Sequence, residues 1–384
     1  MFERILIKSG SQIADRYLSI ADLVDMMFYY GEVHVVVSQF ELKQLLDVFG
    51  EDVLYQLVTS KRLFIHPCSQ HVGAARHGNL ESVGVFSHNF GSIDALLYNY
   101  HKQIVDDAQE NSRFADKFSK VLDEYKFKEG FQTSLYKDVE NAELLSRATQ
   151  VFFKQYYSSY QHIEEIKVAA VPASKSFMSF YQIESNLRMD ELNSLHKQLG
   201  YDGTFTFSTI LMSLGETHAD CYEATDFQAE MIGSQRWSEI YKLRINESIN
   251  QAEGSKEQID HFKEMTVSEF LSPGIAFNEG IISSYDLLND IMSWDSYYFR
   301  KWLSEIPEGQ PLTGELYKDI QAQNSNKIWV KCLRTMTQLI VGLLVPVAGV
   351  SLTLLDGFIG DKLVNGWKPA IFVNNMLAKD AYKK

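Results

Sequence analysis

The run Val33–Val37 most constrains what this chain can fold into. It reads Val-His-Val-Val-Val, so apolar β-branched side chains fall on both faces of an extended strand. A strand of this kind has to be covered on both sides, as in the interior of a parallel sheet. Two similar short runs, Arg4–Ile7 and Arg62–Ile65, precede and follow it. Helical periodicity fills the stretches between them, which predicts a small parallel α/β layer.

The expected helix boundaries support this alternation. Ser19 with Asp22, and Ser38 with Glu41, have the spacing of capping boxes at helix starts. Gly50 is placed to end the second of these helices. Ser82–Phe86 is apolar and predicts a fourth strand of the same sheet.

The middle of the chain is predicted to be mainly helical. From Ser92 to Tyr160, apolar residues recur three or four apart between charges of both signs. Ile163–Val171 predicts one further strand, ended by Pro172. More helices are expected over residues 184–199, 208–214, 226–231, 237–249 and 284–303.

The C-terminal part contains the most apolar segment of the chain, from Gln338 to Leu363. Its uncharged stretch, Leu339–Leu355, has the minimum length of a membrane-spanning helix and is interrupted by Pro346. Small residues recur at helical spacing along one stripe: Gly342, Pro346, Gly349, Thr353, Gly357 and Gly360. Such a stripe lets another helix approach closely. The segment is either the buried central helix of a C-terminal domain or a helix that self-assembles or enters a membrane after a trigger.

The predicted fold class is therefore mixed α/β and α. A small N-terminal parallel α/β subdomain occupies residues 1–91 and a mainly helical domain residues 92–330. A C-terminal apolar helical unit, with the glycine-rich stripe, occupies residues 331–384.

Charge and cysteine content narrow the classes of partner and the compartment. The chain has 50 acidic and 36 basic residues and a net charge of −14, which disfavours nucleic acid as a partner. Its three cysteines lie far apart and form no disulfide framework. The N-terminus reads as a strand and lacks the pattern of a signal peptide. We expect a cytoplasmic protein that can associate with a membrane only through its C-terminal region.

Polar residues follow each of the four expected strands. Because the carboxyl ends of parallel strands meet at one edge of a sheet, we expect these residues to gather there. The candidates at this strand-exit rim are Ser9, Ser11, Ser38, His66, Cys68, His71 and His88.

Three interpretations of this rim remain. Zinc can be held by His66, Cys68, His71 and His88, although their spacing matches no zinc signature. Alternatively, Cys68 or a serine is a catalytic nucleophile, with His66 or His88 as its base. In the third interpretation the serines cap helices and Cys68 is a small buried residue. Ser9, Ser11 and Ser38 are also weak candidates for binding an anion at a helix start.

Two other groups of residues carry metal- or nuclease-type chemistry. His218 and Cys221 lie three residues apart and share a face if they are helical. Glu165 and Lys167 match half of a nuclease element, with Asp138 as the upstream carboxylate.

Two functions follow from these observations. The first is a non-enzymatic interaction protein whose apolar C-terminal helix packs in a homo- or hetero-oligomer or, after a trigger, engages a membrane. The alternative is a soluble metal-assisted hydrolase or nuclease-like enzyme with its site at the strand-exit rim.

Overall fold

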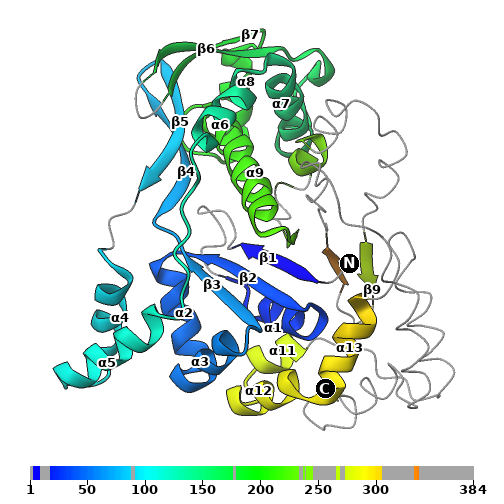
Figure 1. Cartoon of the computed structure of the whole chain (residues 1–384). Coiled ribbons are helices and arrows are strands. Elements are labelled where there is room, and N and C mark those ends of the chain that lie inside the picture. The colour runs from blue at the N-terminus through cyan, green and yellow to red at the C-terminus, as the bar shows by residue number, and fades with distance from the viewer. Residues whose placement is uncertain are drawn as a thin grey trace, which may run out of the picture.

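The protein has a mixed α/β fold, as the sequence predicts. The computed structural model describes residues 3–8, 18–87, 91–175, 179–232, 237, 239–244, 265–268, 273–304 and 333–336. In this part of the chain a four-stranded parallel sheet and a four-stranded antiparallel sheet are joined and covered by helices (Figure 1).

The parallel sheet contains the three N-terminal strands that the sequence predicts. They are β1 (Arg4–Lys8), β2 (Glu32–Val37) and β3 (Leu63–Pro67). The strand order is β3-β2-β1-β8, in which β8 is Glu230–Ile232. All four strands are parallel. The Val-rich strand β2 therefore lies inside the sheet, where apolar residues on both faces are needed.

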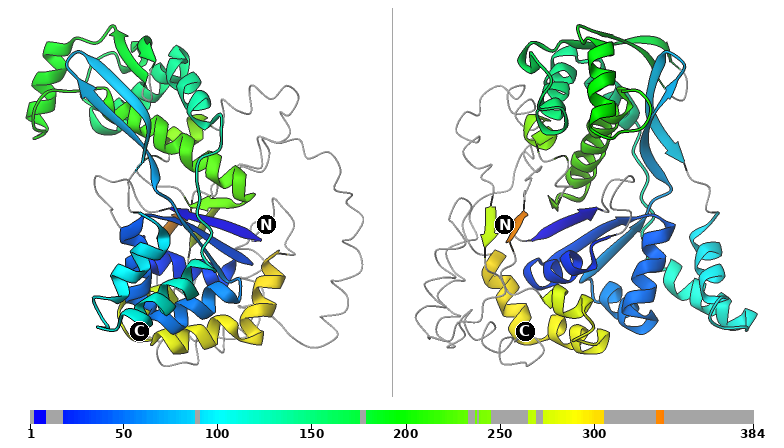
Figure 2. Two further views of the ribbon diagram at one scale, coloured as in Figure 1. Left: turned by 60° about the vertical axis from the view of Figure 1, so that its left-hand side comes forward. Right: turned by 180° about the vertical axis from the view of Figure 1, so that it is seen from behind.

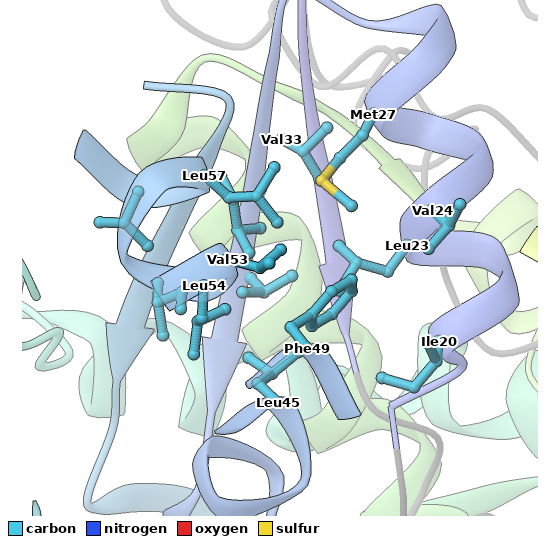
Figure 3. Packing of buried hydrophobic residues seen from close by; sticks show 14 of the residues in the cluster. Ile20, Leu23, Val24, Met27, Val33, Leu45, Phe49, Val53, Leu54 and Leu57 are labelled. Carbon is cyan, nitrogen blue, oxygen red and sulfur yellow. The ribbon is translucent and has the colours of Figure 1, made fainter. Parts of the chain in front are cut away.

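Helices cover one face of this sheet, below it in Figure 1. They are α1 (Ile20–Tyr29), α2 (Gln39–Phe49), α3 (Glu51–Thr59), α11 (Pro273–Asn278), α12 (Ser284–Met292) and α13 (Trp294–Ser304). Alternate strand residues such as Ile5 and Val33 pack into this core with side chains of α1, α2 and α3, for example Phe49 and Leu57 (Figure 3). The predicted capping box of Ser38 and Glu41 forms at the start of α2, and Gly50 follows its end.

The fourth strand of the parallel sheet is not the one that the sequence predicts. Ser82–Phe86 belongs to β5 (Leu80–Ser87), which pairs antiparallel with β4 (Gln70–His77). The chain reverses between them at Gly78, whose φ of 62° suits a tight hairpin turn. The fourth strand is β8, where a helix over residues 226–231 was expected. The preceding helix, Ser208–Phe227, ends at this point because Gln228 adopts the left-handed conformation.

The hairpin β4–β5 belongs to the antiparallel sheet, whose order is β4-β5-β7-β6. The other two strands are β6 (Val168–Lys175) and β7 (Ser179–Ser185). The strand predicted over Ile163–Val171 thus begins later and continues through Pro172. Because β6 lies at the edge of the sheet, a residue without a backbone N–H is tolerated there.

The predicted helical stretch from Ser92 to Tyr160 is confirmed as four helices: α4 (Ile93–His101), α5 (Ala108–Ser119), α6 (Phe131–Glu140) and α7 (Ala142–Tyr156). A 3-10 helix, η1 (Ile163–Glu165), and the helices α8 (Met189–Gln198) and α9 (Ser208–Phe227) follow. α4 and α5 pack beside the parallel sheet's helices. α6 to α9 form a second layer with the antiparallel sheet (Figure 2).

The long helix α9 connects the two layers. Its first part packs on β4, where Gly215 permits a close approach: a Cβ atom there would lie 2.5 Å from Val72 Cγ1. Its C-terminal end reaches the parallel sheet just before β8, as Figure 1 shows. The position of α9 therefore sets how the second layer sits on the sheet.

The predicted C-terminal stripe, Gly342 to Gly360, lies outside the described residues. Upstream of it, β10 (Leu333–Met336) pairs antiparallel with β9 (Met265–Ser268). Among the helices that the structure describes, none combines the length and apolar character needed to cross a membrane. The domain boundaries at residues 91 and 330 remain predictions.

One helix contact of the core yields a stability prediction. Gly274 of α11 donates its N–H to Asp25 Oδ1 at 2.8 Å, and a Cβ atom there would overlap the carbonyl oxygen of Ala21. We expect Gly274→Ala to reduce the free energy of unfolding by about 1–3 kcal/mol, because a backbone atom has to shift. Urea denaturation measures the change. Asn278→Ala, at the exposed end of the same helix, is the control, and an equal effect of both would contradict the packing described.

Candidate functional site

The carboxyl edge of the parallel sheet is the place where a site is expected first. Strands β2 and β3 lie on one side of β1, and β8 pairs with the other side of β1. Ligands of open α/β sheets bind where the strand order reverses in this way. Here the last residue of β1 is Lys8, and the C-terminal half of α9 packs beside it.

Lys8 forms a buried charge cluster with α9. Its Nζ lies 2.5 Å from Glu223 Oε2 and 3.2 Å from Asp220 Oδ1. The side chain of Glu223 is only 1% exposed. Asp220 also accepts a hydrogen bond from the Tyr241 hydroxyl. Two carboxylates thus share one ammonium group in an environment that water hardly reaches.

The pKa values of Lys8 and Glu223 reflect the presence of two buried carboxylates beside one ammonium group. Burial raises the pKa of Glu223 to about 7, although the Lys8 ammonium acts in the opposite direction. Burial alone would lower the pKa of Lys8, but Glu223 and Asp220 together raise it above its ordinary value. Lys8 is therefore charged at neutral pH, while Glu223 gains and loses a proton there. Buried groups that titrate near neutrality are typical of functional sites.

A second polar network lies on the side of α9 that faces α6. His218 Nδ1 lies 2.5 Å from Asp138 Oδ2, and His218 Nε2 lies 2.9 Å from Ser134 Oγ. Ser134 and Asp138 are one turn apart on α6, so they share the face that meets His218. The three side chains form one continuous hydrogen-bonded chain from hydroxyl to imidazole to carboxylate.

The protonation states follow from the surroundings of each group. Burial lowers the pKa of His218 below its ordinary value, so the imidazole is neutral at pH 7. Burial alone would raise the pKa of Asp138, but the hydrogen bond from His218 and the charge of Arg244 lower it. Arg244 donates to the same oxygen, Asp138 Oδ2. An ionised Asp138 requires the proton of His218 to sit on Nδ1, which leaves Nε2 as an acceptor.

Ser134 can therefore give its proton to His218. Its hydroxyl also lies 2.8 Å from the carbonyl oxygen of Phe131, so rotation about one bond moves the hydrogen between the two acceptors. Ser134 is only partly buried. The hydroxyl contacts Nε2 of a neutral histidine and the ionised aspartate contacts Nδ1. This is the arrangement of a Ser-His-Asp triad.

A short segment after β8 holds both networks in place. Trp237 Nε1 donates to Glu216 Oε2 at 2.6 Å, Tyr241 donates to Asp220, and Arg244 donates to Asp138. These contacts run in order along α9 and on to α6. They fix the rotation of α9 and with it the position of His218.

The predicted rim residues take structural positions where they are described. Ser38 caps α2. His66 Nε2 lies 3.0 Å from His34 Nδ1, and burial lowers the pKa of His66 to about 4. Burial raises the pKa of Cys68 to about 11, so its sulfur is a thiol at neutral pH and a weak nucleophile. His71 stacks on Phe86.

The prediction of a site at the rim stays a prediction. Ser9, Ser11 and His88 lie outside the described residues, and β5, which precedes His88, belongs to the antiparallel sheet. Within the part of the chain that is described, no three His, Cys, Asp or Glu side chains form a group that could hold a metal ion. The zinc prediction for His66, Cys68, His71 and His88 therefore has no described site to support it.

Asp138 and His218 are both candidates in the sequence, but the structure pairs them with residues other than those expected. Asp138 was grouped with Glu165 and Lys167, whereas its described partners are His218 and Arg244. His218 was grouped with Cys221, but its imidazole turns to α6. Ser134 was missed. The available signal was a serine and an aspartate four residues apart on a predicted helix, which is too common to single out.

The chain matches no protein-family model, no curated protein and no solved structure.

The Lys8 cluster predicts a large effect of one substitution. Lys8→Met leaves Glu223 and Asp220 buried without their cation, and we expect it to lower the free energy of unfolding by about 3–5 kcal/mol. Lys128→Met is the matched control. Lys128 also pairs with a carboxylate of α9, Asp226 at 2.7 Å, but its side chain is 64% exposed. An exposed pair is worth about 0–1 kcal/mol, so equal effects in urea denaturation would contradict the assignment.

Proposed function

We propose that this protein is a serine hydrolase of acyl compounds, with Ser134 as nucleophile, His218 as general base and Asp138 as the residue that orients the imidazole. The observation that carries the proposal is the chain of two hydrogen bonds, 2.9 Å and 2.5 Å, on the two correct nitrogens of His218. A metal-assisted hydrolase with its site at the strand-exit rim was the second of the two functions expected from the sequence. The site proposed here lies instead between α6 and α9, and its chemistry needs no metal ion.

The reaction follows from the three groups. Ser134 Oγ attacks the carbonyl carbon of an ester, thioester or amide while His218 Nε2 takes the hydroxyl proton. The tetrahedral intermediate expels its leaving group, which receives that proton from His218, and an acyl-serine remains. Water then attacks the acyl-serine, with His218 again as base. The acyl–Oγ bond breaks, His218 returns the proton to Ser134 Oγ, and the carboxylic acid leaves. Asp138 stays ionised and stabilises the imidazolium at each step.

The start of α6 supplies a place for the developing negative charge. Ser134 lies in the first turns of α6, and no side chain of the described residues caps this helix at Gly130. The positive end of the helix dipole lies one turn before the nucleophile, although the N–H of Phe131 already donates to Lys128 O there. Charge stabilisation of this kind is a major contribution to acyl-transfer catalysis.

Labelling with a fluorophosphonate tests the nucleophile directly. We expect the full-length protein to form a covalent adduct on Ser134, located by mass spectrometry, and to hydrolyse a p-nitrophenyl ester. Ser134→Ala should remove the adduct, and His218→Gln should slow its formation by at least about 100-fold, since general-base catalysis contributes that much or more.

Ser194→Ala is the matched control for this experiment. Ser194 is also a helical serine whose hydroxyl donates to a backbone carbonyl, Asp190 O at 2.8 Å, but no histidine is its partner among the contacts described. This variant should label like the native protein. Labelling that survives Ser134→Ala, or no labelling of folded native protein, would refute the proposal.

A second candidate function rests on the C-terminal stripe of small residues. We propose that Gly342, Pro346, Gly349, Thr353, Gly357 and Gly360 form one face of a helix that packs against another copy or a partner subunit, or enters a membrane. This role uses none of Ser134, His218 and Asp138, so it is a separate proposal from hydrolysis.

Substitution on the stripe separates this role from a purely internal one. We expect Gly349→Leu to break the assembly seen by light scattering, or to prevent pelleting with membranes, because a bulky side chain blocks close approach. Ala348→Leu, which adds three of the same four carbon atoms beside the stripe, should leave both readouts unchanged. A native protein that is monomeric and never pellets would contradict the role.

A further inference from the structure

The amino edge of the parallel sheet, opposite to Lys8, holds a pocket of about 380 Å³. It lies where β1 and β2 begin, just before β3, and α13 forms its other wall. Its charged lining is Arg4, Arg62, Arg300, Lys301, Glu3 and Glu32. Positive charge therefore exceeds negative charge here, in a protein whose net charge is −14.

Two arginines of the pocket are held by backbone carbonyl groups. Arg62 donates to the carbonyl oxygens of Met27 at 3.0 Å and Tyr30 at 2.6 Å, and also to that of Gly31. Arg300 donates to Ile291 O at 3.1 Å and more weakly to Met27 O at 3.5 Å. These contacts stabilise the C-terminal end of α1 and explain part of the arrangement.

These hydrogen bonds to carbonyl groups do not neutralise the positive charges of Arg62 and Arg300. Arg300 is 6% exposed and forms no ion pair with a carboxylate of the described residues, and the buried Nε of Arg62 has no hydrogen-bond partner there. The nearby Glu32 already pairs with Arg4 at 2.7 Å. Burial and, to a smaller extent, the charge of Arg62 lower the pKa of Arg300. Burial also lowers the pKa of Arg62, whereas the charge of Glu32 acts to raise it.

We propose that this pocket binds the phosphate group of a small molecule between Arg62 and Arg300. Guanidinium groups bind phosphate oxygens in a paired, planar geometry that lysine cannot reproduce. The volume is within the range of small-molecule sites. Tyr297 also lines the pocket and is 47% exposed, so its ring offers a face on which a planar group attached to the phosphate can stack.

Calorimetric titration of the full-length protein with inorganic phosphate and, separately, with adenosine monophosphate tests the proposal. We expect saturable binding of one anion per chain. Arg300→Lys keeps the charge but loses the fork of donors, and should weaken binding about tenfold or more. Arg4→Gln, at the more exposed side of the pocket, should weaken binding without disturbing the cap of α1.

Two controls make the outcomes distinct. Lys154→Gln removes an exposed lysine of α7 that pairs with Glu164, and should bind like the native protein. Ser134→Ala should also bind normally, so that failure of the proposed hydrolase and failure of this site are separate results. Tighter binding of the nucleotide than of phosphate identifies a phosphorylated compound with a ring; equal binding identifies phosphate itself.

The proposal is overturned by either of two results. One is the absence of saturable binding, as expected if an acidic segment of this chain fills the pocket. The other is binding that Arg300→Lys and Arg4→Gln leave unchanged while both variants show the native melting temperature.

Discussion

The ion pairs of Lys8 with Glu223 and Asp220 determine how the two layers of this molecule fit together. A lysine at the end of a central parallel strand has lost most of its water, and it is tolerated only if carboxylates meet it at close range. Both carboxylates come from α9. The helix that leads into β8 must therefore approach the sheet at this point and with this face.

The same constraint places the proposed catalytic groups. When Asp220 and Glu223 face Lys8, the neighbouring side of α9 faces α6. His218 on that side contacts Ser134 and Asp138, which lie one turn apart on α6. Tyr241 donates to Asp220 of the Lys8 cluster and Arg244 donates to Asp138 of the His218 network. The segment that carries both residues therefore connects the two networks. The two edges of the sheet differ in this respect. At the carboxyl edge Lys8 meets two carboxylates, whereas at the amino edge Arg62 and Arg300 donate to carbonyl groups and form no ion pair with a described carboxylate.

Local patterns predicted the local structure well and the long-range contacts poorly. The strands around Ile5, Val35 and Ile65 and the capping box at Ser38 follow from periodicity and from side chain–backbone hydrogen bonds, which need only neighbouring residues. The strand β8 is short and follows a helix directly, so no pattern distinguishes it. The partners Asp138 and His218 are 80 residues apart. Their contact depends on how α9 is anchored by Lys8, and this anchoring involves a residue more than 200 positions away from Glu223. A single sequence carries no local signal for such pairs.

Nuclear magnetic resonance of the His218 imidazole nitrogens in the full-length protein reports the protonation state on which the proposed triad depends. We expect a neutral ring at pH 7 with its proton on Nδ1, and a titration midpoint below the ordinary value of about 6.5. We also expect Asp138→Asn to shift the proton between the two nitrogens. A ring that carries its proton on Nε2, or that is already protonated at pH 7, would refute the triad, since neither state leaves Nε2 free to accept the proton of Ser134.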